Sequence, residues 1–127
     1  MDVALGNSPF AVTTSDSYQS IRVGKTGVGA VTQSTSALTL SGNLMLGEDA
    51  NSSGTYNLSG GTISSGEAAG IGVGGTGVFN QSGGACSFSV GLYLGNEVGS
   101  SGTYNLDGGT LTTDRVLDGP GTCIFNF

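Results

Sequence analysis

The stretch SGTYNLSGGT at residues 53–62 returns at residues 101–110 as SGTYNLDGGT, with Asp107 in place of Ser59 as the single change. Self-similarity at a fixed period is the signature of repeat proteins, in which each unit buries its apolar residues by stacking on its neighbours. The chain is therefore predicted to be a repeat array. Its function is expected to depend on surfaces and not on an enclosed pocket.

Glycines at the start of each unit set the register of the array. When Gly29, Gly54, Gly77 and Gly102 are taken as equivalent, successive units are 25, 23 and 25 residues long, which makes a 48-residue double repeat. This register predicts one core column two places after the glycines and a second column nine places after them. The first column is Val31, Tyr56, Phe79 and Tyr104, and the second is Leu38, Ile63, Cys86 and Leu111.

A third column is predicted from short segments that alternate as a strand does. They are VALG at 3–6, IRVG at 21–24, LMLG at 44–47, IGVG at 71–74 and LYLG at 92–95. Between the first two columns stand paired glycines, which can take positive φ at a corner without steric cost. These corner glycines are Gly60 and Gly61, Gly83 and Gly84, and Gly108 and Gly109.

Together these patterns predict an all-β fold, a single-stranded parallel β-solenoid (β-helix) with about 23–25 residues per coil. Residues 1–127 are expected to form one domain of about five to six coils. The domain is interpreted as a fragment of a longer repeat protein or as a stacking subunit. A β-propeller fits less well because the chain holds too few blades, and the leucine-rich repeat has a different spacing.

Three segments carry a resemblance to a known class. GVFNQSGG at 77–84, LYLG at 92–95 and SGTYNLDGGTL at 101–111 resemble the repeats of large secreted bacterial surface proteins, the autotransporter-like and PEP-CTERM-sorted β-solenoid families. The resemblance covers residues 21–127. It implies an extracellular or cell-surface stalk, adhesin or matrix component that is not catalytic.

Composition argues against several partners and chemistries. Nine acidic and three basic residues give a net charge of −6, so nucleic acid and anionic lipid are expected to be repelled. No stretch approaches the ~18 apolar residues of a membrane helix, so no membrane insertion is expected. Histidine is absent, which removes imidazole catalysis and the commonest metal ligand.

The remaining candidates for chemistry are carboxylates. Asp107, Asp114 and Asp118 are the nearest set for acid and base work, and Arg115 beside them could imitate the basic residue of solenoid lyases. The EDAN segment at 48–51, mirrored by Asn96-Glu97, is a candidate calcium loop. Solvated surface groups are the favoured interpretation of both sets, so we expect no enzyme, no cofactor and no metal site.

A polar column lies beside the aromatic one. Asn57, Asn80 and Asn105 align, and their amides are predicted to hydrogen-bond along the stack as in fibre ladders. The alternative is a flat face that binds sugar or ice, extended by Thr55, Thr103 and Thr122 with Val78 interrupting. The structural ladder is favoured over this alternative.

Two further predictions concern buried polar and sulfur groups. Gln33 and Gln81 share the parity of the aromatic column, so they are predicted to point inward and to bond backbone carbonyls near a corner. Cys86 and Cys123 fall in different columns on coils two apart, too far for a disulfide. Each cysteine is interpreted as a small apolar filler.

The function expected from all these observations is structural. The chain is interpreted as a rigid stalk, adhesin or fibre-forming segment at the bacterial cell surface or outside the cell. Its expected partners are its own copies stacked end to end, or further coils of the same protein. A module that binds polysaccharide or a cell surface through the Asn/Thr face is the alternative.

Overall fold

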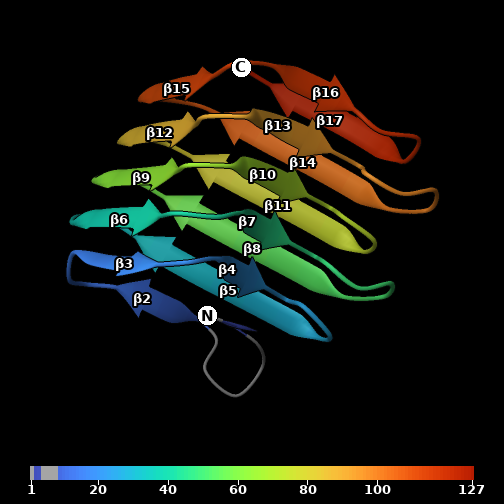
Figure 1. Cartoon of the computed structure of the whole chain (residues 1–127), viewed down its shortest axis with the longest axis horizontal. Helices are drawn as coiled ribbons and strands as arrows, with labels where there is room; N and C mark the ends of the chain where they lie inside the picture. The colour runs from blue at the N-terminus through green and yellow to red at the C-terminus, as the bar shows by residue number, and fades with distance from the viewer. Residues whose placement is uncertain (1, 4–8) are drawn as a thin grey trace.

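The computed structural model describes residues 2–3 and 9–127, and within them it contains strands, turns and bends but no helix. Strands one turn apart pair in parallel and build three sheets that run the length of the stack (Figure 1). The fold is a parallel β-solenoid of about five turns, spaced about 23 residues apart, as the sequence predicted.

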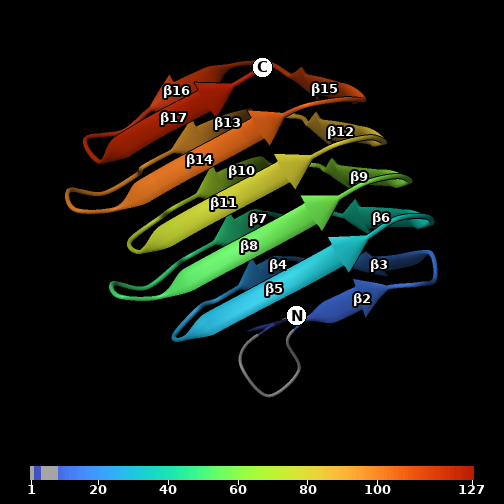
Figure 2. The ribbon, with the colours of Figure 1, turned by 180° about the vertical axis from the view of Figure 1, so that it is seen from behind.

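Each turn contributes one strand to each sheet, in the order B, C, A. Sheet A contains β1 (Asp2–Val3), β4 (Ile21–Val23), β7 (Leu44–Leu46), β10 (Ala68–Ile71), β13 (Gly91–Leu94) and β16 (Val116–Asp118). Sheet B contains β2 (Phe10–Val12), β5 (Val28–Gln33), β8 (Ser53–Leu58), β11 (Thr76–Gln81), β14 (Ser101–Leu106) and β17 (Thr122–Asn126). Sheet C contains β3 (Asp16–Tyr18), β6 (Ala37–Leu40), β9 (Thr62–Ser65), β12 (Ala85–Phe88) and β15 (Thr110–Thr113). The view from behind shows the longer strands of sheet B side by side in front of sheet A (Figure 2).

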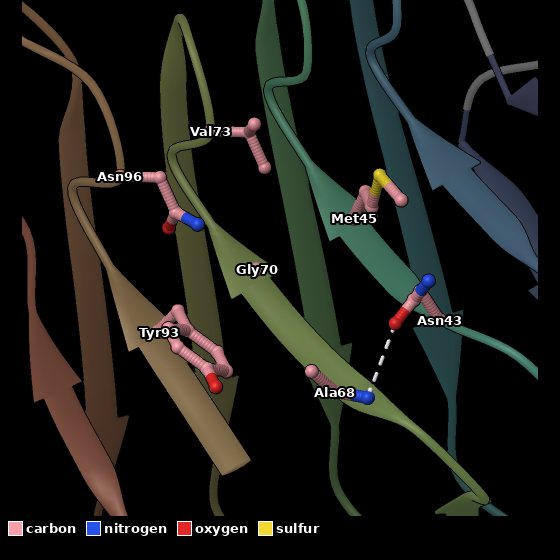
Figure 3. A pocket seen from close by; sticks show the side chains of 7 residues that line it. All are labelled: Asn43, Met45, Ala68, Gly70, Val73, Tyr93 and Asn96. Atoms are coloured by element: carbon pink, nitrogen blue, oxygen red, sulfur yellow. Dashed lines mark hydrogen bonds between the residues drawn. The ribbon is translucent and has the colours of Figure 1, made fainter. Parts of the chain in front are cut away.

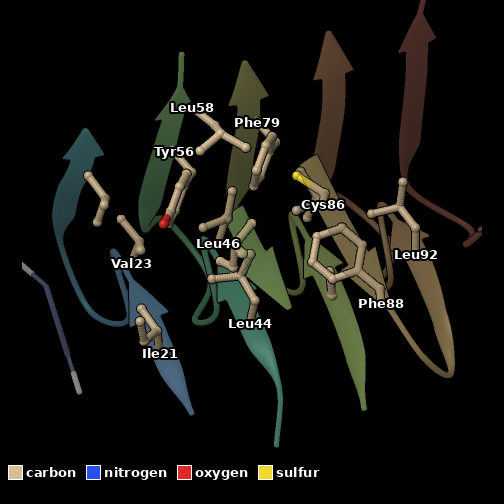
Figure 4. Packing of buried hydrophobic residues seen from close by; sticks show 14 of the residues in the cluster. Ile21, Val23, Leu44, Leu46, Tyr56, Leu58, Phe79, Cys86, Phe88 and Leu92 are labelled. Atoms are coloured by element: carbon tan, nitrogen blue, oxygen red, sulfur yellow. The ribbon is translucent and has the colours of Figure 1, made fainter. Parts of the chain in front are cut away.

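Alternate side chains of all three sheets fill one continuous core (Figure 4). The burial of β8 shows the period of two that a strand requires, since Gly54, Tyr56 and Leu58 are buried and the residues between them are not. Sheet A contributes aliphatic residues, such as Leu44 and Leu46, that are fully enclosed. The solenoid is therefore held by a narrow apolar interior and by hydrogen bonds between turns.

The predicted corners are confirmed. Gly61, Gly84 and Gly109, the second glycine of each pair, have φ of 79°, 73° and 77°. The first full turn has no such pair, yet Ser36 takes a φ of 74° at the equivalent position, directly before β6. The corner geometry is thus kept where glycine is missing.

One predicted register is wrong in sheet A. Ile71 pairs with Leu46, so Ala69 and not Ile71 lies beside Leu44. The segment equivalent to LMLG at 44–47 is therefore AGIG at 69–72, and Val73 follows it in the connection to sheet B. The reason is that Gly72, and not Gly74, takes the positive φ that ends each of these strands.

The first copy of the third column is shifted in the same way. Val3 pairs with Val23, whereas the alignment of VALG with IRVG placed it beside Ile21. Residues 4–6 of that segment lie outside the described residues.

The double repeat comes from the connections between sheets A and B. The connections 47–52 and 95–100 have six residues, while 24–27 and 72–75 have four. This difference of two residues accounts for units of 25 and 23. The long connections share one turn: Asn51 and Gly99 have φ of 65° and 86°, and the Ser52 and Ser100 hydroxyls donate to the carbonyl oxygens of Asp49 and Glu97 at 2.6 and 2.7 Å.

The glycines that set the register lie where sheets A and B converge. Gly29, Gly54, Gly77 and Gly102 pair in one column, as predicted. A Cβ atom built at Gly54 would overlap the carbonyl oxygen of Val23 in the preceding turn. No side chain fits at Gly54, because its backbone is in contact with the backbone of Val23. In the last turn Cys123 occupies this column, and its Sγ lies 2.9 Å from the carbonyl oxygen of Leu94.

Replacing Gly54 by alanine is expected to lower the free energy of unfolding by about 1–3 kcal/mol or more, because the added methyl forces two backbones apart. Gly27→Ala is the matched control, since a Cβ at Gly27 meets no heavy atom within 4 Å. The control should stay within about 0.5 kcal/mol of the parent protein. Urea unfolding followed by circular dichroism measures both values, and equal stability of the two variants would contradict the close contact.

Candidate functional site

The aromatic column runs through the middle of the core. Tyr56, Phe79 and Tyr104 are fully buried, and their rings stack with centroids 5.0 and 4.8 Å apart and planes within 2°. Val31 pairs with Tyr56 in the same column, so all four predicted members are confirmed. Phe125 extends the column into the last turn, with its ring 5.4 Å from that of Tyr104. Stacking at this spacing adds to the energy of burial.

The second predicted column is confirmed in sheet C. Leu38 pairs with Ile63, Ile63 with Cys86, and Cys86 with Leu111. The first three side chains are at most 2% exposed, whereas Leu111 in the last full turn is half-buried. The column therefore acts as packing and presents no group to solvent in the inner turns.

Gln33 and Gln81 are buried and bond corner carbonyls, as predicted. Gln81 Nε2 donates to the carbonyl oxygens of Gly84 at 3.3 Å and of Thr110 in the next turn at 2.8 Å. Gln33 does the same with Ser36 and Thr62 at 3.3 and 2.8 Å. Each amide thus ties two successive corners together.

A partner of these amides was not predicted. The Tyr104 hydroxyl donates to Gln81 Oε1 at 2.5 Å, and the Tyr56 hydroxyl donates to Gln33 Oε1 at 2.5 Å. Each bond joins a glutamine to the tyrosine of the following turn. The signal was present in the sequence. In one column glutamine alternates with leucine from unit to unit, and in the neighbouring column tyrosine alternates with phenylalanine, so that each glutamine is followed by a tyrosine in the next unit.

Burial changes the acidity of these groups. It raises the pKa of both the Tyr56 and Tyr104 hydroxyls, because the phenolate would lose its hydration. It also raises the pKa of the Cys86 thiol to about 12. The interior therefore keeps all three groups neutral, and a neutral buried thiol is a poor nucleophile.

The Gln81–Tyr104 bond can be tested with a double-mutant cycle. Tyr104→Phe leaves Gln81 Oε1 buried without its donor, so the free energy of unfolding should fall by about 1–3 kcal/mol. Gln81→Leu, which copies Leu58 and Leu106, should cost a similar amount because the Tyr104 hydroxyl then loses the acceptor at Gln81 Oε1. The double variant should cost less than the sum of the two single variants. Additive effects in urea unfolding would contradict the bond.

Both cysteines are free, and they lie on different sheets. At pH 8, iodoacetamide should modify the half-buried Cys123 in the native protein and leave Cys86 unmodified, because Cys86 is 2% exposed and its thiolate is strongly disfavoured. In urea both residues should react. Peptide mass spectrometry reads the two sites separately, and equal labelling under native conditions would argue against this burial.

The asparagine ladder is confirmed. Asn80 Nδ2 donates to Asn57 Oδ1 at 2.9 Å, and Asn105 Nδ2 donates to Asn80 Oδ1 at 2.8 Å. Asn126, which was not predicted, continues the ladder by donating to Asn105 Oδ1 at 2.7 Å. The amides of the outer face of sheet B are thus engaged with one another.

The threonine grid proposed beside this ladder is wrong in one position. Thr55, Val78 and Thr103 do form one column, but Thr122 pairs with Ser101. Ile124 takes the place beside Thr103 and is 42% exposed. With Ala30, which pairs with Thr55, three apolar side chains therefore stand in a column that a regular polar grid would need.

The carboxylates stay on the surface. Asp114 contacts its neighbour Arg115 at 3.3 Å, and both side chains are exposed. Asp107 follows β14 and Asp118 ends β16, so the three aspartates come from three different elements. Glu48 of the candidate calcium loop contacts Arg22 of the preceding turn at 2.9 Å. Within residues 2–3 and 9–127, no group of three or more Cys, Asp or Glu side chains is placed to hold a metal ion.

A groove crosses the outer face of sheet A (Figure 3). In this sheet Arg22, Met45, Gly70, Tyr93 and Leu117 form the outward column. Gly70 leaves a gap between Met45 and Tyr93, about 270 Å³ in volume. The other lining residues are Asn43, Ala68, Val73 and Asn96.

The sides of this groove are defined by close packing. A Cβ at Gly70 would lie 2.9 Å from Val73 Cγ2, so the valine side chain lies against the glycine and closes one side. The Tyr93 ring lies over Gly91, with Cε2 3.2 Å from where a Cβ would be. Asn43 Oδ1 accepts a hydrogen bond from the backbone N–H of Ala68 at 3.1 Å, which fixes the orientation of its amide.

No helix in the described part of the chain has the length and apolarity to cross a bilayer. No protein-family model, no curated protein and no solved structure matches this chain.

Proposed function

We propose that this chain is a non-catalytic structural repeat of a bacterial extracellular or cell-surface protein, serving as a rigid stalk, an adhesin segment or a fibre-forming subunit. The observation that carries the proposal is the continuity of side chains and hydrogen bonds between turns. The aromatic column and the asparagine ladder both reach the last described turn, at Phe125 and Asn126. A body built in this way resists bending and can be extended by adding turns.

The resemblance of residues 21–127 to secreted bacterial repeat proteins supports the location outside the cell. The surface chemistry agrees with it, because the net charge of −6 favours solubility and disfavours binding to nucleic acid. Antibody labelling of intact cells that make the natural protein tests the location. Labelling only after the cells are broken would contradict it.

End-to-end association is the partner chemistry that this geometry favours, either with copies of the chain or with further turns of the same protein. Sheet B runs from β2 to β17, and Phe10 at one end belongs to the same column as Phe125 at the other. A head-to-tail contact would therefore continue both the parallel hydrogen bonding and the aromatic stack. Contacts of this kind do not close and produce filaments.

Sedimentation velocity over a concentration series, with electron microscopy, tests this association. The parent protein should form rods that lengthen with concentration. Phe125→Asp should abolish them by placing a charge in the exposed end of the aromatic column, whereas Ile124→Asp, the control with the same charge on the outer face of the same strand, should not. Monomers of the parent protein at every concentration would contradict stacking between copies.

A second candidate function is recognition of a polysaccharide or a cell surface by the Asn/Thr face of sheet B. It is favoured by the regular half-buried amides of Asn57, Asn80 and Asn105, which retain unused donors and acceptors after the ladder bonds are made. Binding to a glycan array that Asn80→Ala abolishes would support this function over a purely structural role.

A further inference from the structure

The residues that form the groove over Gly70 break the 48-residue repeat of the chain. Stacking of equivalent turns therefore does not by itself produce the groove. Gly70 lies 48 residues after Arg22, and Tyr93 lies 48 residues after Met45. Two turns before Gly70, the equivalent position is occupied by Arg22, whose long side chain contacts Glu48. At Gly70 no side chain projects from the strand, although Val73 Cγ2 lies 2.9 Å from where a Cβ would be, and an aromatic ring replaces the methionine beside it.

The surroundings of Tyr93 leave its ring accessible. On the outer face of sheet A, its neighbours toward β10 and along its own strand are small, namely Gly70, Ala68 and Gly91. On the other side Tyr93 pairs with Leu117 of β16. Figure 3 shows the ring leaning toward Ala68 across this floor of small residues. The open face of an aromatic ring attracts the C–H groups that a saturated ring, such as that of a sugar, presents when it stacks on it.

Two amides provide the polar contacts. Since Asn43 Oδ1 accepts from the Ala68 N–H, its Nδ2 is a donor that no other described residue engages. The Asn96 side chain, directed toward Gly70 in Figure 3, also makes no hydrogen bond with a described residue. An apolar ligand would leave these donors unpaired, whereas hydroxyl groups can accept from both.

Charge and size narrow the ligand class. None of the seven lining residues is charged, and the net charge of −6 disfavours anions. The volume of about 270 Å³ lies just below the ~300–1,000 Å³ typical of drug-sized ligands. These features fit one neutral ring with several hydroxyl groups.

We propose that the groove over Gly70 binds one neutral sugar unit, with the sugar ring stacked on Tyr93 and its hydroxyls bonded by Asn43 and Asn96. This inference goes beyond the structural role. It concerns sheet A and neither the ends of the stack nor the Asn/Thr face of sheet B, so it can fail or hold independently of both proposed functions.

Nuclear magnetic resonance titration of the isotope-labelled full chain tests the site. The probes are neutral oligomers of glucose and of N-acetylglucosamine, with a glucuronic acid oligomer as the charged comparison. A neutral oligomer should shift the amide resonance of Gly70 and the ring resonances of Tyr93 with a Kd on the order of 1 mM, as expected for so small a contact. The charged oligomer should bind at least tenfold more weakly.

Three variants make the test specific. Tyr93→Leu removes the ring but keeps an apolar side chain, and Gly70→Ala fills the floor of the groove; each should weaken binding at least tenfold. Tyr18→Leu removes a tyrosine from β3, on another sheet, and should leave the Kd unchanged. Circular dichroism confirms that each variant is folded, and Tyr93→Leu alters no buried contact of the core.

Several results would overturn the proposal. One is the absence of any shift at Gly70 and Tyr93 up to about 50 mM of each neutral oligomer, well above the expected Kd. Another is equal binding by the parent protein and by Tyr93→Leu. A third is a shift of the groove resonances that follows protein concentration without sugar, which would assign the groove to a second copy of the chain.

Discussion

The buried hydrogen bond from the Tyr104 hydroxyl to Gln81, repeated between Tyr56 and Gln33, is the constraint on which the order of this solenoid depends. Apolar columns alone would tolerate a strand that slides by two residues along its neighbour, because such a slide keeps the same side chains in the core and one aliphatic contact resembles the next. A slide of two residues would keep the tyrosine inside but carry it past the glutamine, which would leave the amide without its partner. Since the amide also holds a corner carbonyl in each of two turns, side-chain chemistry and backbone register specify the same alignment.

How far the sequence predicts such a fold depends on whether a position repeats. The columns of sheets B and C were predictable because the near-identical segments at 53–62 and 101–110 fix their alignment. Sheet A was harder, since Ile71-Gly72 and Val73-Gly74 show the same alternation. The spacing of the glycines shows which of the two glycines ends the strand. The spacings between Gly24, Gly47, Gly72 and Gly95 are 23, 25 and 23 residues, which match the alternating units, whereas Gly74 would break this pattern.

The features that escaped prediction involve relations between turns. A Tyr–Gln bond joins residues 23 positions apart, and neither residue alone signals a partner at that distance. The groove over Gly70 is defined by a missing side chain, and it can be located only when Gly70 is known to lie between Met45 and Tyr93. The substitution of Cys123 into the glycine column similarly becomes visible only after β17 is paired with β14.

The alternation of long and short connections gives one edge of the molecule a particular freedom. The six-residue connections lie between turns whose connections have four residues, and no strand of the three sheets includes them. Their first residues are still tied to the preceding turn, since the N–H groups of Glu48 and Asp49 donate to the carbonyl oxygens of Gly24 and Lys25. Extra residues inserted at 50–51 or 98–99, beyond these hydrogen bonds, would therefore change neither the pitch nor the columns. An insertion point for foreign peptides thus recurs at every second turn, roughly 10 Å along the axis. The molecule could therefore serve as a scaffold that displays epitopes at even intervals.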